Sequence, residues 1–299
     1  MDKLVEGEIT QRGPVAAAPA YAVQFFLIPF AVVTLTVLVY MGFRSLVTDQ
    51  RSTQDYLSEI QTGGSSRRWP AAYELSRMMA DPEVARDPAL GPALIKAFEV
   101  SKGDDPRVRR YLALAVGRLT APWPPRTVPA LTEALEDPDS ETVISAIWAL
   151  GSLGDPSVVQ KVGQMYDSAD AGIRKMTVYV LGALPGDAQL QVLATALNDS
   201  MPDVQWNAAI ALARHRNREG VPVLHRMLDR EYVERMVKRT AEPDAEVDPV
   251  GEVMISGLQA IALLQETSLR QEVAELSQGE PNLRVRQAAM ETLNALGPA

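Results

Sequence analysis

The chain has 299 residues, 46% of them hydrophobic and 22% charged, so it can bury a substantial core and is not a disordered chain. Its formal net charge of −9 argues against a general role on nucleic acid or anionic lipid, where a basic footprint is expected. The absence of cysteine excludes disulfides, thiol chemistry and metal sites with cysteine ligands.

The first predicted element is a membrane-spanning helix. No charged residue occurs from Gly13 to Phe43, and the stretch from Val23 to Phe43 would span roughly 31 Å as a helix, which matches a bilayer core. A cleaved signal peptide and a buried soluble helix are the alternatives, but the run is long for a signal peptide and no small-x-small cleavage site follows it. We expect a flexible tail at 1–20 and a single-pass transmembrane helix at 21–45.

The basic residues that flank this anchor give almost no preference for either orientation in the membrane. Lys3 and Arg12 precede the apolar run, and Arg44 and Arg51 follow it, so the positive-inside rule counts two basic residues on each side. Because Arg44 adjoins the run directly, we favour a cytoplasmic carboxy-terminal domain.

A linker with a first short helix is predicted at 46–66. The stretch "TGGSSRRWP", from Thr62 to Pro70, combines glycine, serine and paired arginine, which could bind phosphate. We interpret it instead as a flexible joint in which Ser65 or Ser66 caps the first strong helix.

From residue 67 to the end, the chain repeats itself. The leucines Leu150, Leu181 and Leu212 are 31 residues apart, and a second phase keeps the same step in Leu135, Tyr166, Leu197 and Leu228. A period of this length is typical of a solenoid built from stacked helix pairs. In each unit a first amphipathic helix is followed by a turn with an acid and a proline. The second helix of each unit begins near Val108, Thr142, Ile173, Val204, Val253 and Val285.

Glycine recurs in the second helices at the ninth position after these starting residues, as Gly117, Gly151 and Gly182. We interpret these glycines as sites of close helix packing, and Gly154 as a turn. A phosphate-binding loop would need glycines between a strand and a helix with a lysine nearby, whereas Asp155-Pro156 follows here.

The segments "VRRYLALAVGRL", "VQWNAAIALARH" and "VRQAAMETLNALG" resemble HEAT repeats, in particular the short bacterial kind first described in phycobilisome lyases. The resemblance covers about Tyr56 to Gly297 in about seven units. It implies an all-α fold in which helix pairs form a superhelix that serves mostly as an interaction platform. In this chain we expect one transmembrane helix to precede the superhelix. Two spacings are longer than the rest, 41 residues from Leu75 to Val116 and 49 from Leu212 to Ile261.

The longer of these spacings contains an insertion at about 229–250. Its first part can continue one long helix from Val221 to Arg239, followed by an acidic loop, "TAEPDAEVDP". Such a loop is either a docking element or a solvated excursion without a binding role.

Positions two and six of the second helices point away from the partner helix and carry large side chains. We expect them to line the concave surface of the superhelix and to bind a partner's helix or extended segment, unless neighbouring units cover them. The predicted partner-binding residues are Arg110, Leu114, Ile144, Trp148, Lys175, Tyr179, Trp206, Ile210 and Ile255.

The sequence predicts no catalytic residue, no cofactor and no metal site, because His215 and His225 lie on different helices without a cluster of acidic ligands. The expected function is a membrane-anchored scaffold, not an enzyme, which binds protein partners as a subunit or assembly factor of a membrane complex. The negative net charge favours basic partners.

Two alternatives stay open. One is a sensory or regulatory solenoid that binds a small ligand or nucleic acid, for which a basic patch of Arg107, Arg109, Arg110, Arg118 and Arg126 speaks. The other is a lyase-like accessory protein.

Overall fold

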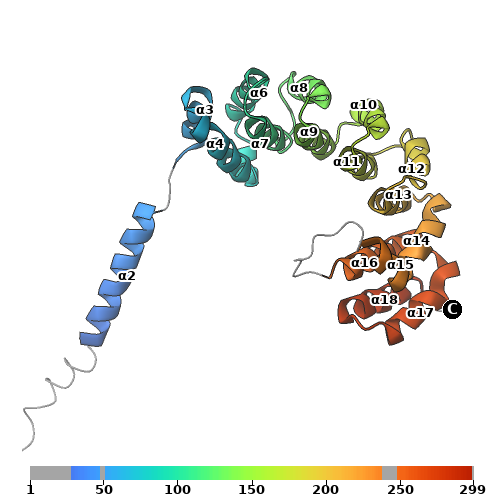
Figure 1. Ribbon diagram of the computed structural model, residues 1–299. Coiled ribbons are helices and arrows are strands. Elements are labelled where there is room, and N and C mark those ends of the chain that lie inside the picture. The colour runs from blue at the N-terminus through green and yellow to red at the C-terminus, as the bar shows by residue number, and fades with distance from the viewer. Residues whose placement is uncertain (1–27, 48–50, 238–247, 298–299) are drawn as a thin grey trace, which may run out of the picture. The chain divides into compact units, whose positions relative to one another are not determined.

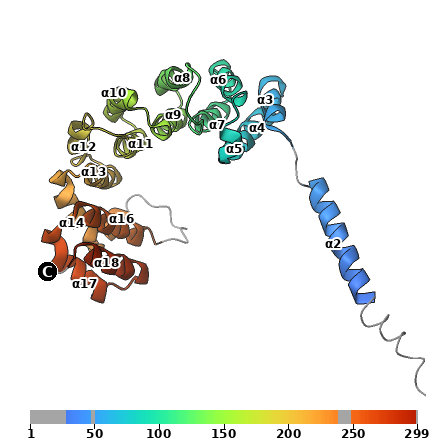
Figure 2. The ribbon, with the colours of Figure 1, turned by 180° about the vertical axis from the view of Figure 1, so that it is seen from behind.

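The computed structural model describes residues 28–47, 51–237 and 248–297, and the chain divides into two units, residues 1–52 and 53–299. The described residues are helical and contain no strand. The second unit is a solenoid of seven helix pairs that follow one another along an arc (Figures 1 and 2). The all-helical repeat fold expected from the sequence is therefore confirmed.

The first helices of the pairs form the outer row of the arc (Figure 1). They are α3 (Thr53–Thr62), α6 (Leu90–Val100), α8 (Thr127–Glu133), α10 (Val159–Gln164), α12 (Leu190–Ala196), α14 (Val221–Leu228) and α17 (Arg270–Gly279). Short 3₁₀ turns extend several of them, at Ala134–Glu136, Pro156–Val158, Met165–Asp167, Arg218–Gly220 and Thr267–Leu269.

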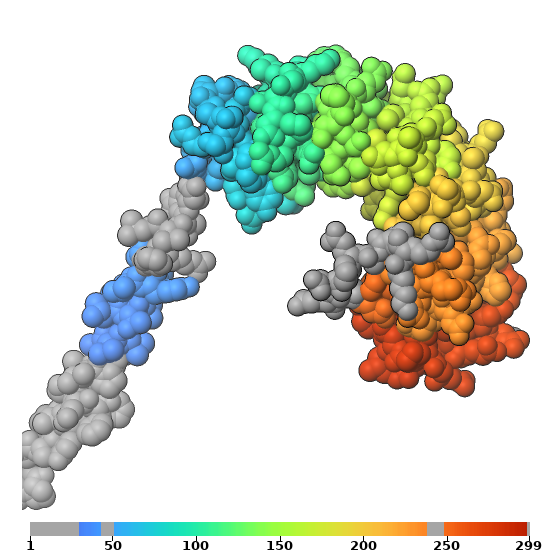
Figure 3. All heavy atoms as spheres, viewed as in Figure 1, coloured from blue at the N-terminus to red at the C-terminus, as the bar shows by residue number. Residues whose placement is uncertain are grey.

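The second helices form the inner row. They are α4 (Ser65–Met78), α7 (Pro106–Val116), α9 (Ser140–Leu153), α11 (Ala171–Leu181), α13 (Pro202–Arg214), α16 (Pro249–Leu264) and α18 (Leu283–Ala295). Two further helices are α5 (Pro82–Ala85), between the first two pairs, and α15 (Arg230–Val237), in the insertion. Figure 3 shows the repeat array as one continuous curved surface.

Acid-containing turns precede the second helices, and most of these helices are capped by a side chain of the turn. Asp105, Asp139 and Asp170 accept hydrogen bonds from the N–H groups of Arg107, Thr142 and Gly172, and Asp248 and Asn282 do the same for α16 and α18. Such caps satisfy donors that the first turn of a helix leaves free. Helix α4 is different, because its cap is Gly64 without a side-chain hydrogen bond, so neither Ser65 nor Ser66 caps it.

The core lies between the two rows. Val116, Leu150, Leu181 and Leu212 are fully buried at equivalent positions of α7, α9, α11 and α13. Helix α3 belongs to the array rather than to a linker, because it packs on α4 and buries Tyr56, Leu57 and Ile60. The solenoid thus begins about fourteen residues before the boundary expected at residue 67.

Successive inner helices approach each other through glycine. A Cβ atom added to Gly117 would lie 2.5 Å from the Cα of Ala149, and one added to Gly182 would lie 2.5 Å from the Cβ of Ala211. At Gly151 the obstacle is the Val180 side chain, at 2.7 Å. These glycines allow neighbouring units to pack closely, as their spacing predicts. Gly154 has φ of +72° and ends α9 in the left-handed conformation, so it marks a turn.

The insertion does not continue one long helix. Helix α14 ends at Leu228, Asp229 is extended, and α15 begins at Arg230. The Asp229 carboxylate accepts a hydrogen bond from the N–H of Tyr232, which starts a new helix instead of prolonging the old one. Most of the predicted acidic loop, residues 240–247, lies outside the described residues, and its last two residues, Asp248 and Pro249, cap and begin α16.

The first unit contains helix α2 (Ile28–Val47), and the side chains described along it are exposed, for example Phe30 at 73% and Val33 at 60%. The tail at 1–20 and the beginning of the expected span, residues 21–27, lie outside the described residues. Among the residues that the structure describes, no helix is both long and apolar enough to cross a membrane. The transmembrane helix expected at 21–45 therefore finds no support in the described helices.

We predict that Gly182→Ala lowers the free energy of unfolding by about 1–3 kcal/mol, because the new methyl group meets the backbone of α13. Gly279→Ala is the matched control, since nothing lies within 4 Å of a Cβ added there, and its effect should stay within about 0.5 kcal/mol. Urea unfolding followed by circular dichroism measures both. Equal effects of the two variants would contradict the close-packing role.

Candidate functional site

The inner row exposes a band of aromatic rings and arginines, which we call the inner ridge: Tyr73, Arg77, Tyr111, Arg118, Trp148, Tyr179 and Arg214. Tyr73 and Tyr179 remain 39% and 45% exposed, and Tyr111 and Trp148 are half-buried. They come from the four successive helices α4, α7, α9 and α11. Large rings that stay partly exposed thus recur in four consecutive units, unlike apolar residues scattered singly over a surface.

The first part of the ridge is an aromatic pair with a cation. Tyr73 and Tyr111 meet edge to face, with their ring centroids 5.1 Å apart and an interplanar angle of 69°. The guanidinium of Arg77 lies 5.8 Å from the centre of the Tyr73 ring and is also paired with Glu74. Edge-to-face packing and a cation over the ring both fix the orientation of these side chains.

The second part repeats the cation-on-ring contact between neighbouring units. The Arg118 guanidinium lies 5.8 Å from the Trp148 ring centre and donates a hydrogen bond to the carbonyl of Ser76. The Arg214 guanidinium lies 5.7 Å from the Tyr179 ring centre. Each contact joins adjacent inner helices, so the ridge is held in place before any partner binds.

The structure divides the predicted partner-binding residues into three groups. Trp148, Tyr179, Leu114, Ile144, Ile210 and Ile255 are half-buried or exposed on the inner row. Trp206 is only 5% exposed, so its expected exposure to solvent is corrected. It belongs to the same buried cluster as Val233 and Val237 of α15, the extra helix that the insertion adds.

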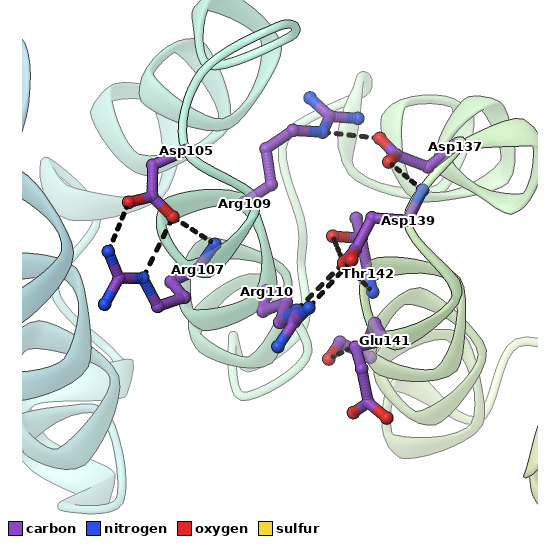
Figure 4. A network of polar contacts seen from close by, with 9 residues as sticks. Asp105, Arg107, Arg109, Arg110, Asp137, Asp139, Glu141 and Thr142 are labelled. Carbon is purple, nitrogen blue, oxygen red and sulfur yellow. Dashed lines mark hydrogen bonds and ion pairs between the residues drawn. The ribbon is translucent and has the colours of Figure 1, made fainter.

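The third group consists of Arg110 and Lys175, whose charges are engaged between units. Arg110 donates two hydrogen bonds to Asp139, at 2.7 and 2.8 Å, and Lys175 donates to Asp203 at 2.9 Å. Figure 4 shows the first of these contacts from close by. Both side chains therefore connect neighbouring repeats.

The same view shows why the predicted basic patch is not a free positive surface (Figure 4). Arg107 is paired with Asp105, and Arg109 with Asp137 at 2.7 Å, in addition to the Arg110 pair. Arg126 contacts both Glu99 and Glu133. Four of the five arginines thus have carboxylate partners, which compensate much of the positive charge of the patch.

Hydrogen bonds from arginine help to lower the pKa values of two aspartates in the repeat array, Asp139 and Asp199. The hydrogen bonds from Arg110 hold the pKa of Asp139 far below its usual range, burial opposes this, and the Thr142 hydroxyl and N–H lower it further. Burial alone would raise the pKa of Asp199, but Arg174, the Met201 N–H and the Tyr166 hydroxyl outweigh it and lower the pKa. Burial and the neighbouring Asp199 raise the pKa of Tyr166 to about 12.

The histidines take local contacts. His215 Nε2 lies 3.1 Å from the carbonyl of Leu181 and 3.2 Å from Gln189 Nε2, and His225 Nε2 lies 3.7 Å from a Glu272 oxygen. No group of three or more possible metal ligands occurs among the described residues.

The ridge residues that sequence reasoning missed are Tyr73, Tyr111 and the three arginines. Tyr73 is equivalent to Trp148 and Tyr179 if Leu75 is counted as position eight of its helix. Arg77, Arg118 and Arg214 then share position ten, one helical turn beyond position six. The pattern was present in the sequence, but the long first spacing obscured it.

With this geometry established, the chain was compared with known proteins. The sequence profile of HEAT repeats matches residues 91–182 and 162–242, which together cover just over half of the chain. A curated relative, the uncharacterised phycocyanin operon protein Y of Pseudanabaena tenuis (strain PCC 7409), is 27% identical over 184 residues. This match covers 58% of the chain and only 40% of the relative.

Solved structures share the fold. The complex of CpcE and CpcF of phycocyanin lyase from Nostoc sp. PCC7120 matches with 18% identity and a TM-score of 0.50, over 84% of this chain and 96% of that chain. An engineered protein matches with 16% identity and a TM-score of 0.43, over 83% of this chain and 97% of its own. At these identities the likeness concerns the helix-pair architecture.

We predict that Asp139→Asn lowers the free energy of unfolding by about 1–2 kcal/mol at pH 7, because it removes the ionised partner of Arg110. A carboxylate with a lowered folded pKa stabilises above its unfolded pKa of about 3.9 and loses this effect as the pH falls toward the folded pKa. The difference between wild type and variant should therefore shrink below about pH 4. Urea unfolding between pH 3 and pH 7 measures it. Asp187→Asn, at an exposed turn, is the control. A difference in the free energy of unfolding between wild type and Asp139→Asn that does not change with pH would contradict the role of the ionised Asp139.

Proposed function

Since the chain belongs to the HEAT-repeat family, we propose that it is a binding scaffold that holds a polypeptide segment of another protein along its inner ridge. The observation that carries this proposal is the row of partly exposed rings, Tyr73, Tyr111, Trp148 and Tyr179, on four successive inner helices. Tyrosine, tryptophan and arginine dominate the binding energy of protein interfaces. The proposed action is binding and not catalysis.

The ridge suits a segment rather than a small molecule. Its rings follow one another from unit to unit, as an extended or helical segment would need. The Arg118–Trp148 and Arg214–Tyr179 contacts restrain these side chains in the free protein, so little side-chain freedom is left to lose on binding. The curved array supplies the geometry, and the ridge supplies the affinity.

We predict that the double variant Trp148→Ala/Tyr179→Ala weakens binding of a protein that co-purifies with the full-length chain by at least about tenfold. The matched control is Val100→Ala/Leu283→Ala, which removes exposed apolar side chains outside the ridge, 71% and 68% exposed. Titration of the isolated partner against the three proteins by calorimetry measures the affinities. Unchanged affinity in the ridge variant would exclude the ridge as the binding surface.

We further propose that the scaffold is attached to a membrane, where it is a subunit or assembly factor of a membrane complex. It rests on the uncharged run from Gly13 to Phe43 and on the exposed apolar side chains along α2, such as Leu35 and Leu38. Confinement to a bilayer would raise the effective concentration of the scaffold for membrane-bound partners. We keep the cytoplasmic orientation as part of this proposal, because Arg44 adjoins the run.

We predict that the full-length chain floats with phosphatidylcholine vesicles in a density gradient and that Leu35→Arg abolishes this flotation. A charge at the centre of a spanning helix costs about 2.5–3.5 kcal/mol. Leu35→Ala is the control that removes the side chain without adding charge. A wild-type chain that stays in the bottom fraction would refute membrane attachment while leaving the ridge proposal intact.

A second candidate function is that of an accessory protein in chromophore handling. The curated relative carries the name of a phycocyanin operon protein, and CpcE and CpcF belong to phycocyanin lyase. Absorbance of the purified protein above the aromatic band would favour this role. The nucleic-acid alternative receives no comparable support, because four arginines of the predicted basic patch have carboxylate partners.

A further inference from the structure

A hollow of about 350 Å³ lies on the inner row between α11, α13 and α16. Its walls include Tyr179 and Arg214 of the inner ridge, the polar side chains of Asn207 and Gln259, and the apolar side chains of Ile210 and Leu263. It therefore continues the ridge toward the carboxy-terminal units. Leu263 is 38% exposed, so an apolar side chain of a bound segment has a surface to contact there.

The charge of this hollow is opposite in sign to that of the whole chain. Among the described residues that line it, Arg214 is the one charged residue and none is a carboxylate. The acids nearest along the lining helices are already engaged, since Asp203 pairs with Lys175 and Glu252 pairs with Arg284. The net charge of −9 thus describes the surface as a whole but not this site.

Arg214 also lies over an aromatic ring, and no acid of the described residues neutralises it. Its guanidinium lies 5.7 Å from the Tyr179 ring centre, and no ion pair or hydrogen bond of its side chain occurs among the described residues. A stacked guanidinium keeps its N–H donors along its edge, where they match the two oxygens of a carboxylate. Arg118, the other stacked ridge arginine between units, already donates to the carbonyl of Ser76.

We propose that the hollow receives the carboxylate of an aspartate or glutamate side chain of the bound segment, next to a large apolar residue that contacts Ile210 and Leu263. Arg214 pairs with the carboxylate, and Gln259 and Asn207 provide a polar wall around it. This inference rests on the proposed function, because it specifies the chemistry of the segment that the inner ridge holds. The net charge of the chain predicts a basic partner, whereas this hollow favours an acidic group of the partner.

The test is a selection of random twelve-residue peptides, displayed on phage, against the immobilised full-length chain. The wild type should enrich peptides with aspartate or glutamate beside a large apolar residue. Arg214→Gln should lose the preference for the acid, and Arg226→Gln should retain it, because that exposed arginine lies on α14 outside the hollow. The ridge variant Trp148→Ala, at a residue outside the hollow, reports separately on the ridge.

The enriched peptide is then synthesised in two forms, with the acid and with its amide, and titrated by fluorescence anisotropy. Changing glutamate to glutamine should weaken binding to the wild type about fivefold and should have no further effect on Arg214→Gln. Ridge-dependent peptides without an acidic preference would overturn this inference and leave the proposed function standing. A wild type that enriches no more peptide than the ridge variant would overturn both.

Discussion

The close approach of successive inner helices is the constraint on which the rest of the structure depends. Gly117 and Gly182 face Ala149 and Ala211 so closely that no side chain fits between them. On the outer row, by contrast, spaces remain between first helices, about 710 Å³ between α10 and α12 and about 830 Å³ between α6 and α8. Helix pairs that touch on one side and separate on the other must follow a curve, so the small inner residues produce the arc seen in Figure 1.

Ion pairs between units fix the register of this stack. Arg109 and Arg174 hold the same position, the fourth residue of their helices, and reach Asp137 and Asp199 in the turn of the next unit. The Arg109–Asp137 pair is nearly buried on both sides, at 9% exposure each, so each charge depends on its partner. This explains the recurrence of valine followed by arginine at the start of the second helix: the valine is buried in the core, and the arginine connects the unit to its neighbour.

Much of the fold could be predicted from the sequence because it depends on local repetition. The 31-residue step, the acid-containing turns and the recurring glycine each reflect a contact that is the same in every unit. The departures came where one unit differs from the others. Trp206 has the same position as other surface residues, but it is buried in a cluster with residues of α15, the extra helix of the unit that follows. Similarly, α3 was assigned to the linker, and Tyr73 was not recognised as equivalent to Trp148, because the first spacing is ten residues longer than the period.

The candidate site was harder to predict because its side chains are defined by contacts between units. Arg110 lies on α7 and Arg118 in the turn directly after it, and their sequence context offers no reason to treat them differently. In the structure, Arg110 is paired with Asp139, whereas Arg118 lies over the ring of Trp148. Position along the helix decides this. An arginine near the start of an inner helix meets the acidic caps of the next unit, whereas Arg118 and Arg214, near or just past the end of theirs, lie over rings of neighbouring inner helices. The arginines near the start therefore hold the units together, and those near the end remain at the surface beside Trp148 and Tyr179.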